Sequence, residues 1–223
     1  MKAIVVAAGD LDPSDATLIE SAELLVAVDR GAVWLAARSL RPDLLVGDLD
    51  SVPEDVVSRL ATAGVEVDRR AVDKDASDTE LAIERAVDAG ATRITLLGAL
   101  GGRRLDHELA NLLLLADPRW RVAGVDLRIV RDGTTVRALH GGDSLALEGA
   151  TGETVTLLPI GGPAHGVRTI GLRFPLAGES LDFGRSRGLS NQIVASPASV
   201  SLAGGTLIVI ETEGGDTDEL HST

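Results

Sequence analysis

The chain has 223 residues, of which 44% are hydrophobic and 25% are charged, and its formal net charge at pH 7 is −13. This composition is typical of a folded globular protein and excludes an intrinsically disordered chain. The negative charge argues against nucleic acid and anionic membranes as partners, so an anionic ligand must be held by local groups. The absence of cysteine excludes disulfide bonds, thiolate catalysis and zinc–thiolate sites.

The apolar run near the N-terminus covers only residues 3–8, which is too short for the core of a signal peptide. No run approaches the roughly 18 apolar residues that a membrane span requires. A chain without cysteine is also compatible with a reducing compartment. We therefore expect a cytoplasmic protein that has no membrane partner.

Up to about residue 132, short apolar runs alternate with amphipathic segments. The runs lack polar alternation and stop at Gly or Asp, as buried parallel strands do. They cover residues 3–8, 24–28, 44–46 and 94–97. The segments with helical spacing cover residues 32–39, 54–63, 79–89 and 105–116, and Leu105, Leu109, Leu112 and Leu113 in the last one have core spacing. This order predicts an α/β domain over residues 1–132, with a doubly wound, mostly parallel sheet and helices on both faces.

The composition changes near Gly133. Of the 21 Asp, 17 precede this residue, whereas 16 of the 25 Gly lie at or after it. Short candidate strands separated by Gly-rich turns follow, at residues 134–139, 144–147, 154–158, 166–171, 190–195, 199–202 and 206–211. We predict a β-sandwich domain over residues 133–213 and a flexible, polar tail over residues 214–223.

Carboxylates follow three successive predicted strands of the first domain. Asp29 follows the run at 24–28, Asp48 and Asp50 follow the run at 44–46, and a third run at residues 65–67 is followed by Asp73, Asp75 and Asp78. Ligands of an open parallel sheet bind at the carboxyl ends of its strands, so we expect these groups to share one crevice. Facing carboxylates repel each other unless a cation compensates them, and oxygen ligands without cysteine favour Mg²⁺. Asp48 and Asp50 are the preferred metal ligands, with Asp78 as a third; the alternative is that each Asp only forms a turn or caps a helix.

A Gly-rich turn leads into the predicted helix at 105–116, within the segment GALGGRRLDHELANLLLL. Small residues and first-turn N–H groups favour phosphate at such a place, and Arg103 or Arg104 can add charge-assisted hydrogen bonds. Lys74 is a second candidate phosphate clamp, although a solvated surface role suits both Lys74 and Arg103. Asp106 is either a metal ligand or a favourable negative charge at the positive end of the helix dipole. The segment is neither a Walker A sequence nor a GxGxxG fingerprint.

Five fragments in order resemble the thiamine pyrophosphokinase (thiamine diphosphokinase) family. They are VAVDRGAVWL, RPDLLVGDLDSV, DKDASDTELAI, GALGGRRLDHELANL and GLRFPLAGESLDFGRSRGLSNQ, and the match spans most of residues 1–211. The resemblance implies that the hydroxyethyl oxygen of thiamine attacks the β-phosphorus of Mg–ATP, which yields AMP and thiamine diphosphate. It also implies a homodimer whose thiamine lies between the α/β domain of one subunit and the sandwich of the other.

The resemblance also assigns roles to residues of this chain. Asp48, Asp50, Asp75 and Asp78 become catalytic, and Asp73 and Asp106 join the ATP-binding set with Lys74 and Arg103. Asp29, Ser190 and Asn191 become substrate-binding, since Ser190 and Asn191 match the Ser-Asn pair that holds the thiamine pyrimidine.

Two departures from the family pattern concern the site. Asp29-Arg30-Gly31 stands where members often have Asp-Gly-Gly, which places a cation beside the site. Many members stack thiamine on a Trp of the sandwich, whereas this sandwich has only Phe174 and Phe183 as aromatic candidates.

Three alternatives to the family function stay open. The first is a pyrophosphokinase of the same fold that acts on a pterin-like alcohol. The second is a sensor that binds thiamine or nucleotide without turnover. The third is a structural module stabilised by Ca²⁺, although an EF-hand is disfavoured because DKDASDTELAIE lacks the Gly at its sixth position.

Overall fold

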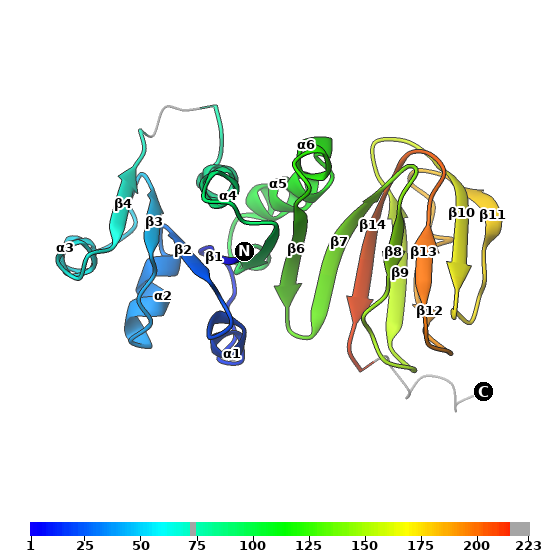
Figure 1. Ribbon diagram of the computed structural model, residues 1–223, viewed down its shortest axis with the longest axis horizontal. Helices are drawn as coiled ribbons and strands as arrows, with labels where there is room; N and C mark the ends of the chain where they lie inside the picture. Colours follow the sequence, from blue (N-terminus) through cyan, green and yellow to red (C-terminus); the bar gives the residue numbers. More distant parts are fainter. Residues whose placement is uncertain (72–74, 215–223) are drawn as a thin grey trace. The chain divides into compact units, whose positions relative to one another are not determined.

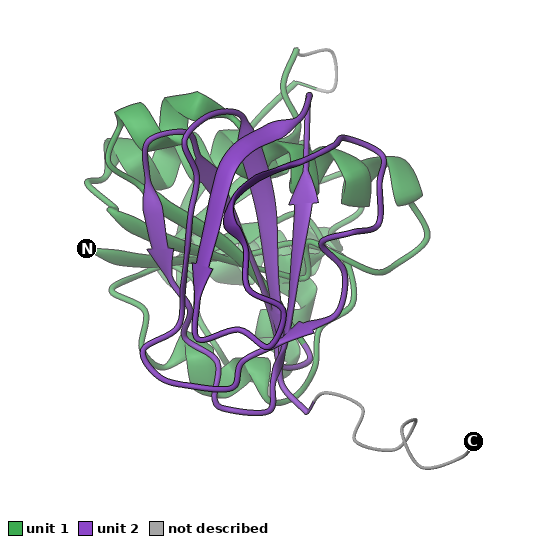
Figure 2. Ribbon diagram, turned by 90° about the vertical axis from the view of Figure 1, so that its right-hand side faces the viewer, with its two compact units in different colours: residues 1–131 green, residues 132–223 purple. Residues whose placement is uncertain are grey.

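The computed structural model describes residues 1–71 and 75–214, and these form two compact units. The first unit comprises residues 1–131 and the second begins at Asp132 (Figure 2, green and purple). Asp73, Lys74 and residues 215–223 of the predicted tail lie outside the described residues. Within the described part, none of the helices combines the length and the apolar character needed to cross a bilayer.

The first unit is built on a parallel sheet (Figure 1). Its strands are β1 (Lys2–Val6), β2 (Leu24–Val28), β3 (Leu44–Gly47), β4 (Glu66–Arg69), β5 (Arg93–Leu97) and β6 (Asp126–Arg131). They lie in the order β6-β5-β1-β2-β3-β4, and each neighbouring pair is parallel. The predicted α/β fold class is therefore confirmed, and β6 is a strand that the apolar runs did not reveal.

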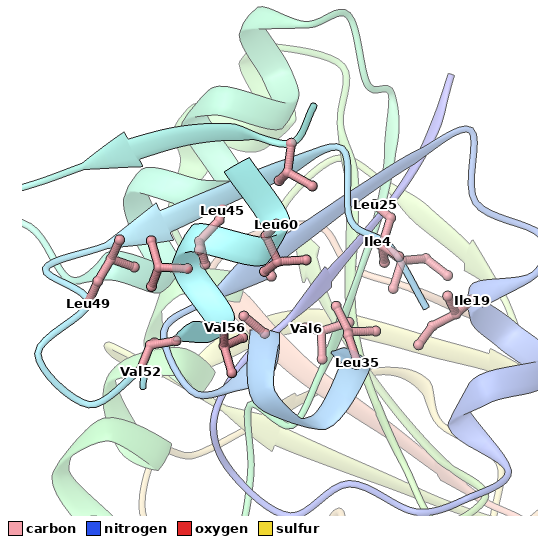
Figure 3. Close-up of a cluster of buried hydrophobic side chains, with 14 of the residues drawn as sticks. Ile4, Val6, Ile19, Leu25, Leu35, Leu45, Leu49, Val52, Val56 and Leu60 are labelled. Carbon is pink, nitrogen blue, oxygen red and sulfur yellow. The ribbon is translucent and has the colours of Figure 1, made fainter. Parts of the chain in front are cut away.

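Helices cover both faces of this sheet. They are α1 (Asp15–Ile19), α2 (Gly31–Ala37), α3 (Glu54–Thr62), α4 (Asp78–Asp88), α5 (Leu105–Leu115) and α6 (Pro118–Val122). On one face, Leu35 of α2 and Leu60 of α3 pack in one apolar cluster with Ile4 and Leu45 of the strands (Figure 3). On the other face, α4 buries Ile83 and contacts β1, β2 and β3 (Figure 1). The short helices α1 and α6 escaped prediction because five residues do not establish a helical period.

The second unit consists of antiparallel strands in two sheets. Its strands are β7 (Thr134–His140), β8 (Ser144–Ala146), β9 (Thr154–Pro159), β10 (Ala164–Ile170), β11 (Ala177–Leu181), β12 (Asn191–Gln192), β13 (Ser199–Ser201) and β14 (Thr206–Thr212). Within this unit, one layer has the order β12-β9-β14-β7 and the other β11-β10-β13-β8. Leu157 and Leu207 of the first layer share an apolar cluster with Val167 and Val200 of the second. This sandwich-like arrangement agrees with the predicted fold, although the predicted strand at 190–195 is ordered as a strand only at β12.

The leucines on the outer face of α5 correct one sequence prediction. Leu105, Leu109 and Leu113 were expected in the core, yet they are 67%, 52% and 56% exposed. The residues that α5 buries are Asn111 and Leu115. Spacing along a helix identifies an apolar face, but it does not identify what covers that face.

Candidate functional site

A crevice of about 820 Å³ lies at the carboxyl edge of the parallel sheet. The strands β1 and β5 are neighbours at the centre of the sheet. The strand that follows β1, which is β2, lies on one side of this pair, and the strand that follows β5, which is β6, lies on the other side. Such a reversal of strand order is where open α/β sheets bind ligands. The lining comes from the segments after β1, β2, β3 and β5, from one face of α2 and from the starts of α4 and α5.

Two carboxylates after β3 form the acidic part of the crevice. Asp48 and Asp50 flank Leu49, whose φ of 63° lies in the left-handed region that a leucine adopts at a cost in free energy. The Asp50 amide donates to Asp48 Oδ1 at 3.1 Å. Hydrogen bonding to the Asp48 side chain, and then the Asp48 charge, raise the pKa of Asp50 above its ordinary value, and the charge of Asp78 adds to this. The carboxylates of Asp48 and Asp50 therefore repel each other when both are ionised.

Asp29 reaches the same crevice from the end of β2. Its backbone also lies in the left-handed region, with φ of 45°, and its amide donates to Val46 O at 3.1 Å. Its carboxylate lies against the α-carbon of Gly47, where any β-carbon would overlap Oδ1. The glycine at the end of β3 thus makes room for the acid at the end of β2.

The loop before α4 brings only part of the predicted acidic set to the crevice. Asp78, the first residue of α4, lines it together with Ser77. Ser77 caps the helix by accepting from the Glu80 amide at 3.2 Å, which orients this turn. Asp75 is described but is not part of the lining. Its predicted catalytic role therefore has no geometric support from the crevice.

The Gly-rich segment after β5 forms another part of the lining. Gly98, Gly101 and Gly102 all have positive φ, so the turn depends on residues without a side chain. Two backbone hydrogen bonds join this turn to the segment after β1: Gly9 N donates to Gly98 O at 2.7 Å, and Asp10 N donates to Leu100 O at 3.1 Å. The two loops therefore support each other as one wall.

Basic groups lie where this wall meets α5. Arg103 and Arg104 both line the crevice. The Arg104 guanidinium donates to both oxygens of Asp106, at 2.9 Å and 2.5 Å, and this contact holds the pKa of the Asp106 carboxyl well below its usual range. Asp106 does not line the crevice. Asp106 is placed to orient Arg104, and a direct contact from Asp106 to ATP stays a prediction.

Ser190 and Asn191 belong to the second unit. Asn191 is buried, and its side-chain amide is engaged by the main chain: Phe174 N donates to Oδ1 at 3.0 Å, and Nδ2 donates to Phe174 O at 2.8 Å. Ser190 has a positive φ of 53° and its amide donates to Thr156 Oγ1 at 3.1 Å. Asn191 thereby fixes the backbone of Phe174, a residue that is 63% exposed.

Asn111, Trp34 and Arg38 are among the crevice residues that the sequence did not predict. Asn111 is buried on α5, and its Nδ2 donates to Ala99 O at 2.7 Å, which ties the Gly-rich turn to the helix. Trp34 and Arg38 line the crevice from α2 and from the residue that ends it. Their separation of four residues on a predicted helix was the signal that could have identified them as neighbours.

The carboxylates of the crevice suit a magnesium ion whose coordination shell also includes phosphate oxygens. In the part of the chain that the structure describes, no three His, Asp or Glu side chains are grouped as a metal site. The predicted ligand set of Asp48, Asp50 and Asp78 is therefore not assembled as three ligands. A close pair of carboxylates is nevertheless what Mg²⁺ uses when substrate phosphates and water complete its shell.

Comparison with known proteins agrees with this geometry. The family model "Thiamin pyrophosphokinase, catalytic domain" matches residues 16–134, which is more than half of the chain, and "Thiamin pyrophosphokinase, vitamin B1 binding domain" matches residues 144–207. The chain belongs to the thiamin pyrophosphokinase family. The first match includes the acidic pair and the Gly-rich turn, and the second includes Asn191 and Phe174.

Relatives of this family align along nearly the whole chain. Thiamine pyrophosphokinase of Bacillus subtilis (strain 168) is 26% identical over 215 residues, which cover 95% of this chain and 99% of the relative. The crystal structure of thiamine pyrophosphokinase from Bacillus subtilis superposes with a TM-score of 0.84 at 25% identity, over 95% of this chain and 99% of that one. The thiamin pyrophosphokinase of Geobacillus thermodenitrificans gives a TM-score of 0.79 at 28% identity, over 97% and 99% of the two chains.

Proposed function

We propose that this member of the family is an active thiamine pyrophosphokinase that uses ATP as the donor. The hydroxyl oxygen of thiamine forms a bond to the β-phosphorus of ATP, and the bond from that phosphorus to the oxygen bridging to the α-phosphorus breaks. The hydroxyl proton is released, and the products are thiamine diphosphate and AMP. The observation that carries the proposal is that the acidic pair Asp48–Asp50 and a Gly-rich turn line one crevice of the family's catalytic domain.

The residues of the crevice suit the demands of this transfer. Phosphoryl transfer requires alignment of the two oxygens and neutralisation of phosphate charge more than covalent chemistry. Asp48 and Asp50 would hold Mg²⁺, which neutralises phosphate charge when it is bound. The Gly-rich turn lets phosphate oxygens approach the backbone, and Arg103 and Arg104 add positive charge on the same wall.

We propose the second unit as the thiamine-binding part. The match to the vitamin B1 binding domain over residues 144–207 supports this assignment. Asn191 would act there by holding Phe174, whose exposed ring offers a surface for the flat rings of thiamine. A direct contact from Ser190 to thiamine stays a prediction, as does the cytoplasmic location.

A homodimer is part of the proposal. Leu105, Leu109 and Leu113 form an exposed apolar stripe along α5, and we name these three residues the α5 stripe. Exposed leucines at this spacing lose water contact when a second copy covers them. The stripe supports a subunit interface on the catalytic unit.

The test is a product assay with matched variants. The protein is incubated with Mg–ATP and thiamine, and nucleotide and thiamine products are separated by chromatography. We expect equal amounts of AMP and thiamine diphosphate, and a loss of roughly 100-fold or more in Asp50→Asn. Asp55→Asn is the control, because Asp55 pairs with Arg59 on the exposed surface of α3.

Other outcomes would reject the proposal. ADP as the nucleotide product would contradict pyrophosphoryl transfer. AMP formed with a pterin-like alcohol but not with thiamine would reassign the acceptor. Nucleotide binding without any product would identify a sensor.

A further inference from the structure

A cation stacked on an aromatic ring forms one wall of the crevice, and the proposed mechanism leaves it unused. The Arg38 guanidinium carbon lies 3.8 Å from the centre of the Trp34 ring. Arg38 also donates from Nη1 to Trp34 O at 3.4 Å. Trp34 packs in turn against the apolar core cluster, so the stack is anchored on the protein side. Both residues line the crevice.

The stack lies on the helix whose N-terminus follows Asp29, one of the carboxylates that line the crevice. Arg30 is the N-cap of α2 and lies between Asp29 and the helix, and Trp34 follows Arg30 by four residues, which corresponds to about 6 Å along a helix axis. Val33 and Ala37 line the crevice on the same helix, and Leu11 lines it from the segment after β1. The crevice thus changes along α2 from carboxylates and glycines to flat and aliphatic surfaces.

This wall matches a purine base attached to phosphates. Bases stack on aromatic rings and on guanidinium planes, and such stacking tolerates different bases but favours large ones. Thiamine also has flat rings, but it carries a positive charge, and Arg30 and Arg38 both line this wall. Like charges disfavour thiamine here and favour an anionic ligand.

We propose that the Trp34–Arg38 stack is the surface that receives the adenine base of the donor nucleotide. This inference rests on the proposed function, since it assigns the part of the crevice that selects the nucleotide. It predicts preference for purine over pyrimidine nucleoside triphosphates, because a purine covers more of the stack.

Tryptophan fluorescence provides a readout that does not need turnover. The chain has two Trp and no Tyr. Trp120 is buried and its Nε1 donates to Leu114 O at 2.8 Å, so it is not available to a base. Mg–ATP should quench the fluorescence of the unmodified protein, whereas Mg–tripolyphosphate, which has no base, should not. In Trp34→Phe the quench should disappear, because only Trp120 still emits.

Steady-state kinetics separates stacking from charge. Trp34→Ala should raise KM for ATP about tenfold or more, with a smaller rise in Trp34→Phe and no change in KM for thiamine. Arg38→Lys keeps the positive charge but removes the planar guanidinium group. Its KM for ATP should therefore rise as much as that of Arg38→Ala. Arg59→Ala, which removes an exposed guanidinium of α3, is the control. The ratio of kcat/KM for ATP to that for CTP should fall in Trp34→Ala.

Several results would overturn the inference and leave the proposed function standing. One is an unmodified protein that makes AMP and thiamine diphosphate while Trp34→Ala keeps its KM for ATP. Another is Arg38→Lys with the KM of the unmodified protein, which would show that charge alone acts. A quench by thiamine in the absence of nucleotide would assign the stack to the acceptor. Absence of product in the unmodified protein would instead refute the proposed function, whatever the fluorescence shows.

Discussion

The carboxylate of Asp29 lies directly against the α-carbon of Gly47, in the space that a side chain at residue 47 would occupy. Gly47 ends β3 with φ of 148°, and Asp29 follows β2 with φ of 45°. Neighbouring strands therefore deliver an acid and the space for it to the same edge of the sheet. Asp29 can reach the crevice only because residue 47 has no β-carbon.

We predict that Gly47→Ala displaces Asp29 and destabilises the first unit. The change should cost about 3 kcal/mol in the free energy of unfolding, since it adds a steric overlap to an unfavourable φ. Gly64→Ala is the matched control: Gly64 also has a positive φ, of 84°, but its β-carbon would meet nothing within 4 Å. That control should cost about 1 kcal/mol. Urea unfolding followed by Trp34 and Trp120 fluorescence measures both, and equal costs would contradict the contact.

The raised pKa of Asp50 predicts opposite effects on stability and activity. A carboxyl whose pKa is higher in the folded state binds its proton more tightly there, so its ionisation destabilises the fold as pH rises through that pKa. At pH 7 without metal, Asp50→Asn should therefore have a Tm at or above that of the unmodified protein, although its activity is lost. Mg–ATP should raise the Tm of the unmodified protein but not that of the variant.

Differential scanning fluorimetry with EDTA or with Mg–ATP measures these shifts. Asp55→Asn should keep the Mg–ATP shift, because its carboxylate pairs with Arg59 outside the crevice. A lower Tm of Asp50→Asn in EDTA would show that repulsion from Asp48 is not the dominant effect.

Asn191→Ala should affect thiamine more than ATP. The substitution removes both hydrogen bonds to the Phe174 backbone and leaves that backbone without its partner, at a cost of about 1–3 kcal/mol in unfolding free energy. The released Phe174 should raise KM for thiamine, while KM for ATP stays within about twofold. Phe174→Leu, which leaves the Asn191 contacts in place, should raise KM for thiamine without the loss of stability. Equal increases in both KM values would remove Asn191 from the acceptor site.

If the α5 stripe is the subunit interface, dimer formation should depend on its leucines. Leu109→Glu and Leu113→Glu each place a charge within the stripe, which a covered apolar interface does not tolerate. Analytical ultracentrifugation should find the unmodified protein as a dimer and these variants as monomers with an unchanged circular dichroism spectrum. Leu18→Glu, on α1 at 38% exposure, is the control that should remain dimeric. A monomeric unmodified protein would refute the interface.

Local patterns were sufficient for much of this molecule. Apolar runs that end at Asp or Gly predicted β1, β2, β3 and β5, because strands buried on both faces need no polar alternation. The position of Asp48 and Asp50 after such a run predicted the acidic edge, because parallel strands present their carboxyl ends together. Family fragments in the right order then predicted the reaction.

What side chains contact was decided only by the tertiary structure. The spacing of Leu109 and Leu113 is the same whether a helix face is buried in the core or exposed, as it is here. Asn191 is an ordinary turn residue by sequence, and only the fold brings its amide to the Phe174 backbone. The stack of Trp34 and Arg38 lines a crevice together with the loops after β1 and β5, which are distant from it along the chain. Periodicity is a property of neighbouring residues, whereas burial and partnership depend on segments that are distant along the chain.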